Sequence, residues 1–93
     1  MTSEERSLIA YRMSRAHEAI EEAQILFDAG HINSYVNRLY YACFYAVSAL
    51  LLRKGMSTSK HGYLRSLLHR EFVREGFIPK ELGKHFDLLF DSR

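Results

Sequence analysis

The chain has 93 residues, a length that suits one small domain with a single core. Hydrophobic residues make up 47% and charged residues 26%, proportions that are ordinary for a globular protein and exclude a disordered one. The formal net charge of +2 lacks the strong basic balance of a dedicated DNA-binding module, so binding of nucleic acid would require a local basic patch.

The first predicted helix covers about residues 3–29. Thr2 followed by Glu5 fits a capping box at its start, and Gly30 is suited to the left-handed position just after its end. Apolar residues recur at alternating steps of four and three, which is typical of a buried helical seam. The seam consists of Ile9, Met13, Ala16, Ile20, Ala23 and Phe27. The link of residues 31–32 is so short that the next helix must pack antiparallel to this one.

The second predicted helix, residues 33–54, is the most apolar part of the chain. Between Leu39 and Leu52 only Ser48 interrupts the apolar and aromatic residues. A helix that is apolar on every side is expected to be buried on every side. The apolar run would rise only about 21 Å as a helix, too short to cross a bilayer core of about 30 Å. Asn33 is the predicted N-cap, and Gly55 suits the residue after the C-cap.

Two further helices are predicted, over about residues 60–74 and 79–92. Ser59 is the expected N-cap of the third helix, and Pro79 is expected at the first position of the fourth. The fourth helix is still apolar at Phe90, which suggests a truncated last helix or a partner that completes the bundle. The sequence therefore predicts an all-α fold, an antiparallel up-and-down bundle of four helices, in a single domain over residues 1–93.

The first residues of the chain and its single cysteine bear on the cellular location of the protein. The first residues are acidic and polar, with no apolar segment behind a basic start, so we expect neither a signal peptide nor a membrane span. A cytoplasmic location is the resulting expectation. Cys43 lies midway along the apolar helix, where a small buried hydrophobe is expected rather than a reactive thiol.

A polar stripe on the apolar helix is the most informative feature for function. Its residues are spaced by three and four positions, namely Asn37, Arg38, Tyr41, Tyr45 and Ser48. In one interpretation Arg38 extends to solvent near the helix start and the tyrosine hydroxyls bond to nearby backbone. In the other, Arg38 contacts a phosphate and the tyrosines offer stacking faces, as in nucleotide and single-stranded RNA sites. The residues alone leave both interpretations open.

A second candidate contact lies at the start of the third helix. Lys60 and His61 fall in its first turn, where backbone N–H groups attract anions, so we expect a corner that could face a phosphate. His61 and His69 are about 12 Å apart along one helix and cannot share a metal ion. No metal site and no cofactor are expected, and no catalytic triad, paired carboxylate or glycine-rich phosphate loop is present. The glycines are all interpreted as turns and helix ends.

The motif N-R-L-Y-Y-A in the second helix, followed by S-K-H-G at the start of the third, resembles the HEPN domain (higher eukaryotes and prokaryotes nucleotide-binding). The resemblance covers about residues 8–93 and is strongest to the stand-alone prokaryotic branch. It implies an antiparallel helical bundle that often forms a homodimer and is often encoded beside a minimal nucleotidyltransferase, as a toxin–antitoxin pair. Many such proteins are metal-independent ribonucleases, and others bind nucleotides or act as a scaffold for a partner.

The ribonuclease members carry an arginine followed by four to six residues and a histidine, on a late helix. Here Arg12 and His17 have that spacing but lie on the first helix, while Arg65 and His69 are too close together. The catalytic residues are therefore unknown. The first hypothesis is a nucleotide- or RNA-binding module that uses Asn37, Arg38, Tyr41, Tyr45, Lys60 and His61. The alternatives are a dimeric ribonuclease toxin and a non-catalytic structural partner of a nucleotidyltransferase.

Overall fold

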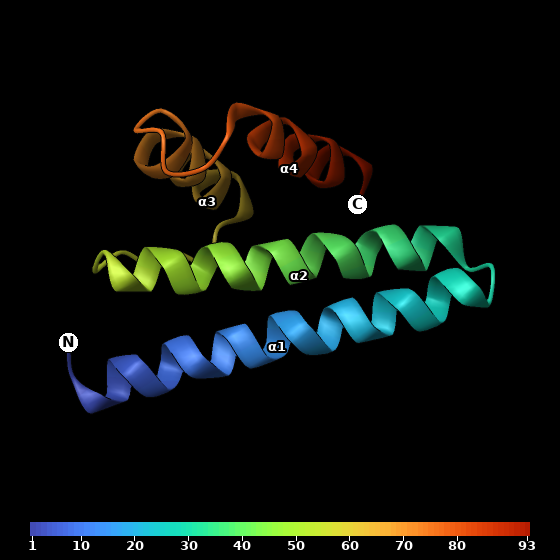
Figure 1. Cartoon of the computed structure of the whole chain (residues 1–93), viewed down its shortest axis with the longest axis horizontal. Helices are drawn as coiled ribbons and strands as arrows, with labels where there is room; N and C mark the ends of the chain where they lie inside the picture. Colours follow the sequence, from blue (N-terminus) through green and yellow to red (C-terminus); the bar gives the residue numbers. More distant parts are fainter.

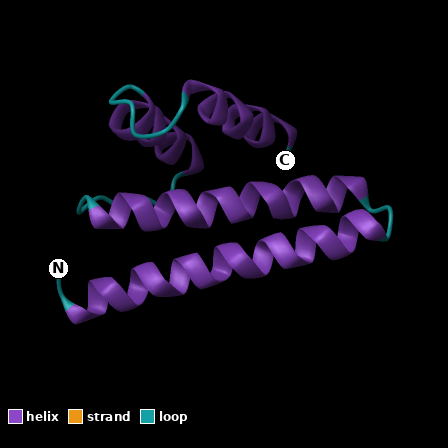
Figure 2. Ribbon diagram, viewed as in Figure 1, coloured by secondary structure: helices purple, strands orange, loops and turns teal.

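A computed structural model describes all residues of the chain, 1–93, and contains helices without strands. The helices are α1 (Ser3–Asp28), α2 (Ile32–Arg53), α3 (His61–Leu68) and α4 (Lys80–Ser92). A short π-helical turn, η1 (His69–Val73), continues directly from α3. The all-α prediction with four helices is thus confirmed, and Figure 2 shows only helices joined by loops.

The helix ends follow the sequence signals in part. The capping box forms, because the Thr2 hydroxyl accepts a hydrogen bond from the Glu5 N–H and the Glu5 carboxylate accepts from the Thr2 N–H. Gly30 and Gly55 have the expected positive φ values, 80° and 75°. The predicted N-cap Asn33 is wrong: α2 begins one residue earlier, after His31, and no side chain caps it.

The third helix also starts and ends differently from the prediction. Lys60, not Ser59, is its N-cap residue, and the Lys60 N–H donates to the Thr58 hydroxyl. Its last turn widens into η1, where the Arg74 N–H bonds to the His69 carbonyl at 2.8 Å. A π-helical turn has no simple sequence signature, because it depends on how the helix packs rather than on local propensity.

The α1–α2 hairpin forms one layer and α3 and α4 form a second. Figure 1 shows α1 and α2 running antiparallel along their whole length, with the fainter, more distant α3 and α4 on the other side of α2. The short connection after Asp28 enforces this hairpin, as predicted. The central helix α2 therefore lies between α1 and the α3–α4 layer.

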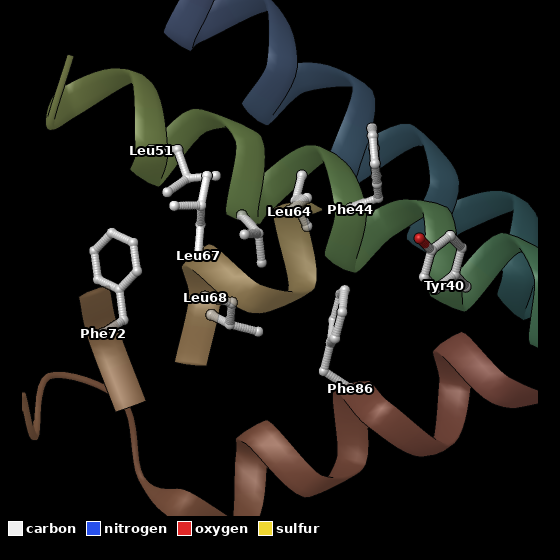
Figure 3. Close-up of a cluster of buried hydrophobic side chains, with 9 residues drawn as sticks. Tyr40, Phe44, Leu51, Leu64, Leu67, Leu68, Phe72 and Phe86 are labelled. Carbon is white, nitrogen blue, oxygen red and sulfur yellow. The ribbon is translucent and has the colours of Figure 1, made fainter. Parts of the chain in front are cut away.

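The core lies between α2 and the second layer. Its fully buried large side chains are Tyr40, Leu51, Leu64 and Leu67. Figure 3 shows leucines from α3 directed toward α2, with Phe86 of α4 closing the cluster from the far side. Burial of a leucine of this kind stabilises a fold by about 1.5–3 kcal/mol.

The α1–α2 contact is built from small residues and leaves one side of the hairpin open. Ala16, Ala19 and Ala23 are buried against α2, whereas Met13, Ile20 and Phe27 are 37%, 52% and 51% exposed. Alanines allow close approach of the two helices, so Met13 and Ile20 lie largely outside the contact. Phe27 reaches α2 only through its ring pair with Tyr35, whose centroid is 5.0 Å away. The expectation that α2 is buried on every side is also wrong, because Leu50 is 37% exposed. No helix has both the length and the apolar character needed to span a membrane.

The contact between η1 and α4 depends on Gly83. This glycine is buried in α4, and a Cβ atom built on it would lie 2.9 Å from His69 Cε1. His69 Nε2 in turn lies 3.0 Å from Asp87 Oδ1, one turn further along α4. The interpretation of every glycine as a turn or helix end is therefore wrong for Gly83, which permits a close approach between two elements.

Candidate anion-binding site on helix α2

The predicted polar stripe lies along α2 on the side between α1 and the second layer. Arg38 and Tyr45 contact side chains of α1, since Arg38 pairs with Glu22 and the Arg15 guanidinium lies 5.3 Å from the Tyr45 ring centroid. Tyr41 faces the second layer, with its ring centroid 6.0 Å from that of His61. Asn37, Arg38, Tyr41 and Tyr45 therefore lie along a groove between α1 and the second layer, whereas Ser48, the last residue of the stripe, is buried.

One end of this groove is a cleft of about 620 Å³, which we term the arginine cleft. Its walls come from the end of α1, the start of α2 and the end of α4. The lining residues are Leu26, Asn33, Ser34, Asn37, Arg38, Ser92 and Arg93. All but Leu26 are polar or positively charged, and two are arginines. No carboxylate lines the cleft, so the cleft itself favours anions.

The start of α2 adds to this preference. Asn33 and Ser34 lie in the first turn of α2, which has neither a side-chain cap nor an acidic residue. The first backbone N–H groups of a helix lack intrahelical partners, and the helix dipole favours negative charge there. Backbone donors and the Arg38 and Arg93 guanidinium groups thus belong to the same cleft.

Arg38 has partners within the protein, but they do not occupy all the hydrogen-bond donors of its guanidinium group. Its Nη1 lies 3.4 Å from Glu22 Oε1, its Nη2 lies 3.4 Å from Asn37 Oδ1, and its Cζ lies 5.0 Å from the Tyr41 ring centroid. The Glu22 side chain is 49% exposed, and an exposed ion pair of this kind contributes about 0–1 kcal/mol. A phosphate could therefore replace Glu22 as the partner of Arg38 at little cost.

Tyr40 links this cleft to His61, a connection that the sequence did not predict. The Tyr40 side chain is fully buried, and its hydroxyl lies 2.6 Å from His61 Nδ1. The His61 ring stacks on Phe44 with centroids 4.3 Å apart. Burial raises the pKa of Tyr40, so its hydroxyl keeps the proton, and the direction of its hydrogen bond with His61 is set by the histidine tautomer. Burial, with a smaller effect from the Arg93 charge, lowers the pKa of His61.

Arg93 lies at the junction of the cleft and this aromatic cluster. Its Cζ is 5.0 Å from the Tyr40 ring centroid and 4.5 Å from that of Phe90. Arg93 could not be recognised from the sequence as a site residue, because it simply follows the last apolar turn of α4. Tyr40 could have been suspected, since a buried tyrosine usually requires a hydrogen-bond partner and His61 is the polar residue of the S-K-H-G motif.

The structure brings together some of the predicted site residues and separates others. Asn37 and Arg38 line the arginine cleft, and Tyr41 lies between Arg38 and His61. Tyr45 lies further along α2, against Arg15, and Lys60 is exposed outside the cleft. No cluster of His, Cys, Asp or Glu side chains has the geometry to hold a metal ion. Cys43 packs against the core, and burial raises the pKa of its thiol.

The sequence comparisons show the family to which this all-α chain belongs. The HEPN domain family model matches residues 9–93, and the chain belongs to this family. A "UPF0332 protein" of Thermotoga maritima is 45% identical over 98% of this chain and 69% of its own length. The "Putative toxin MJ0142" of Methanocaldococcus jannaschii is 27% identical over 87% of this chain and 55% of its own length.

A third relative shows how the matched lengths compare. The "UPF0332 protein PH1297" of Pyrococcus horikoshii is 34% identical over 73% of this chain and 48% of its own length. The chain thus spans between about half and about two thirds of the length of these three relatives. No solved structure matches the chain.

Proposed function

We propose that this HEPN domain binds the phosphate groups of a nucleotide or of RNA in the arginine cleft. The observation that supports this most directly is the convergence of Arg38, Arg93 and the uncapped start of α2 on one cleft without a carboxylate in its lining. Arginine forms paired, charge-assisted hydrogen bonds with phosphate oxygens, and free N–H groups at a helix start add further donors.

Aromatic residues beside the cleft favour a ligand that carries bases. Tyr41 is half-buried next to Arg38, and Tyr45 follows it with ring centroids 6.2 Å apart. Each base stacked on an aromatic ring contributes about 1–3 kcal/mol to single-stranded nucleic-acid binding, largely without regard to sequence. Asn37, Arg38, Tyr41 and Tyr45 are therefore the proposed contacts of the first hypothesis, whereas Lys60 lies outside this cleft.

The wider role that we propose is that of one member of a toxin–antitoxin type pair with a minimal nucleotidyltransferase. The name of the Methanocaldococcus jannaschii relative supports a toxin-like role. In such a pair the phosphate-binding cleft would act on or sense RNA, and the partner protein would control its access to the ligand.

Metal-independent RNA cleavage is a second candidate function, and the Tyr40–His61 pair is the observation that favours it. In the tautomer whose Nδ1–H donates to the Tyr40 hydroxyl, His61 Nε2 can accept a proton from a 2′-hydroxyl, and a nearby guanidinium can stabilise the charge that develops on phosphate. Loss of His61 would then abolish cleavage in the presence of EDTA, while RNA binding at Arg38 would persist. If the wild-type protein does not cleave RNA, only the binding function remains.

The binding function is tested by titrating a labelled short RNA with the wild type, Arg38→Ala and Glu22→Gln. Hydrogen bonds to a charged group contribute about 1.5–3 kcal/mol, so Arg38→Ala should weaken binding at least about tenfold. Glu22→Gln should strengthen it, because the carboxylate that competes with phosphate is removed.

Arg74→Ala is the matched control, since Arg74 is exposed beside α4 and lies outside the arginine cleft. Circular dichroism must show that each variant keeps its helices. The proposal is wrong if Arg38→Ala and Arg74→Ala bind RNA equally well, or if Arg38→Ala simply unfolds the chain.

A further inference from the structure

A second cleft lies further along the same groove and shares no residue with the arginine cleft. It has a volume of about 510 Å³ and lies between α1, α2 and the loop before α3. We term it the serine cleft. Its lining residues are Arg12, Phe44, Ser57, Thr58, Ser59 and His61, among which there is no carboxylate.

Arg12 is the least satisfied charged side chain of the molecule. Its Nε atom is buried and has no hydrogen-bond partner, and the guanidinium takes part in no ion pair. By contrast, Arg15 pairs with Glu18 at 2.6 Å, and Arg38 pairs with Glu22. A buried donor without an acceptor costs about 1–3 kcal/mol, and more when it is charged. The Nη groups of the same guanidinium are not buried and form no hydrogen bond or ion pair, so an anion in the cleft could pair with them.

His61 offers a donor from the opposite wall of the cleft. Its Nδ1 is occupied by the Tyr40 hydroxyl, and in the tautomer in which that hydroxyl donates, the neutral ring carries its proton on Nε2. Nε2 makes no hydrogen bond within the protein. The ring cannot rotate freely, because it stacks on Phe44 and Tyr40. In that tautomer an N–H donor is available at the cleft, which is the form that an anion would select.

Hydroxyl groups complete the lining. Ser57 and Ser59 are exposed, and their side chains bond to no other residue, whereas the Thr58 hydroxyl already accepts from the Lys60 N–H. A guanidinium, a histidine N–H and free hydroxyls together match a tetrahedral oxyanion, which offers acceptors in several directions. Each of these groups can donate, and the only fixed negative charge would be that of the ligand.

We propose that the serine cleft is a second anion site, in which Arg12, His61 and the serine hydroxyls bind an inorganic phosphate or a phosphate monoester. This site does not depend on the function of the arginine cleft. The two clefts have separate arginines, so the arginine of one cleft can be replaced without altering the lining of the other cleft.

The test follows the His61 ring proton resonances by NMR while inorganic phosphate is added to the wild type, Arg12→Gln and Arg38→Gln. The wild type and Arg38→Gln should show saturable shifts, and Arg12→Gln should need at least about tenfold more phosphate. Without phosphate, Arg12→Gln should be at least as stable as the wild type, because Arg12 has no partner to lose and its buried unpartnered Nε is removed. A nucleoside monophosphate in place of inorganic phosphate distinguishes an ester from the free ion.

The proposal is overturned if the His61 resonances do not move in the wild type. It is also overturned if Arg12→Gln leaves the phosphate response unchanged, or if the response disappears only in Arg38→Gln. Ser59→Ala provides a second variant in case Arg12→Gln does not fold, and it should weaken the response without altering the helices.

Discussion

At the scale of single residues, Arg38 and His61 each contact two neighbouring side chains that fix their orientation. Arg38 lies between Glu22 and Tyr41, and His61 lies between Tyr40 and Phe44. Helical spacing predicted that Asn37, Arg38 and Tyr41 share a face. It could not predict that Tyr40 contacts His61 and Arg93, because that proximity depends on where α3 and α4 pack against α2.

The pH dependence of stability follows from His61. Its pKa is lowered in the folded state, chiefly by burial, so below its ordinary value of about 6.5 the unfolded chain binds the proton more readily. The stability of the wild type should therefore fall as the pH decreases through and below this value. Melting temperatures of the wild type and His61→Gln, measured between about pH 7.5 and about pH 5.5, test this.

The other histidines are common to both proteins, so their contributions cancel in the comparison. The wild type should lose more stability on acidification than His61→Gln does. An equal loss in the two proteins would show that His61 does not resist protonation.

At the scale of elements, the number and order of the helices could be predicted from the sequence. Most predicted helix ends lie within one or two residues of the ends in the structure. Apolar periodicity suffices for α1 and the uninterrupted apolar run for α2, each with the glycine after its end, because these signals depend on local chemistry. The π-helical turn η1 and the buried Gly83 could not be predicted. Both arise from the fit between η1 and α4, which is a property of the packed structure.

Gly83→Ala should destabilise the protein despite the better helix propensity of alanine. Its Cβ would lie 2.9 Å from His69 Cε1 and 3.1 Å from Val73 Cγ2, which would displace His69 from Asp87. Overpacking costs about 1–3 kcal/mol, and alanine recovers about 1 kcal/mol in a helix. Urea unfolding should therefore show a small net loss of stability.

Gly62→Ala is the matched control, because it lies in α3 with no atom within 4 Å of the added Cβ. This variant should be more stable than the wild type by about 0.5–1 kcal/mol. If the two variants shift the urea midpoint in the same direction, close packing does not explain why residue 83 is a glycine.

At the scale of the whole molecule, one side of the α1–α2 hairpin carries apolar residues at seven-residue spacing. On α1 these are Met13, Ile20 and Phe27, and on α2 they are Ile32, Leu39 and Ala46. Helical geometry places both stripes on the side away from the groove. We propose that a second copy of the chain covers this face, so that two hairpins form an antiparallel four-helix arrangement with both anion clefts free.

The homodimer is tested by sedimentation of a variant that carries Ile20→Glu and Leu39→Glu. Charges on this face should convert a dimer into a monomer, because they would be buried without partners. Leu88→Glu is the control, since Leu88 is 65% exposed on α4 and should leave the dimer intact. A wild-type monomer at all concentrations, or a dimer unaffected by the double substitution, contradicts this arrangement.

The proposed phosphate binding is tested most directly by mapping RNA onto the chain by NMR. Addition of a short single-stranded RNA to the isotope-labelled protein should shift the backbone amides of the first turns of α2, above all Asn33, Ser34, Asn37 and Arg38. Shifts at these residues that saturate, and that weaken with added salt, are the predicted result. Shifts confined to other surfaces, or none in the folded protein, would contradict the assignment of the arginine cleft as the ligand site.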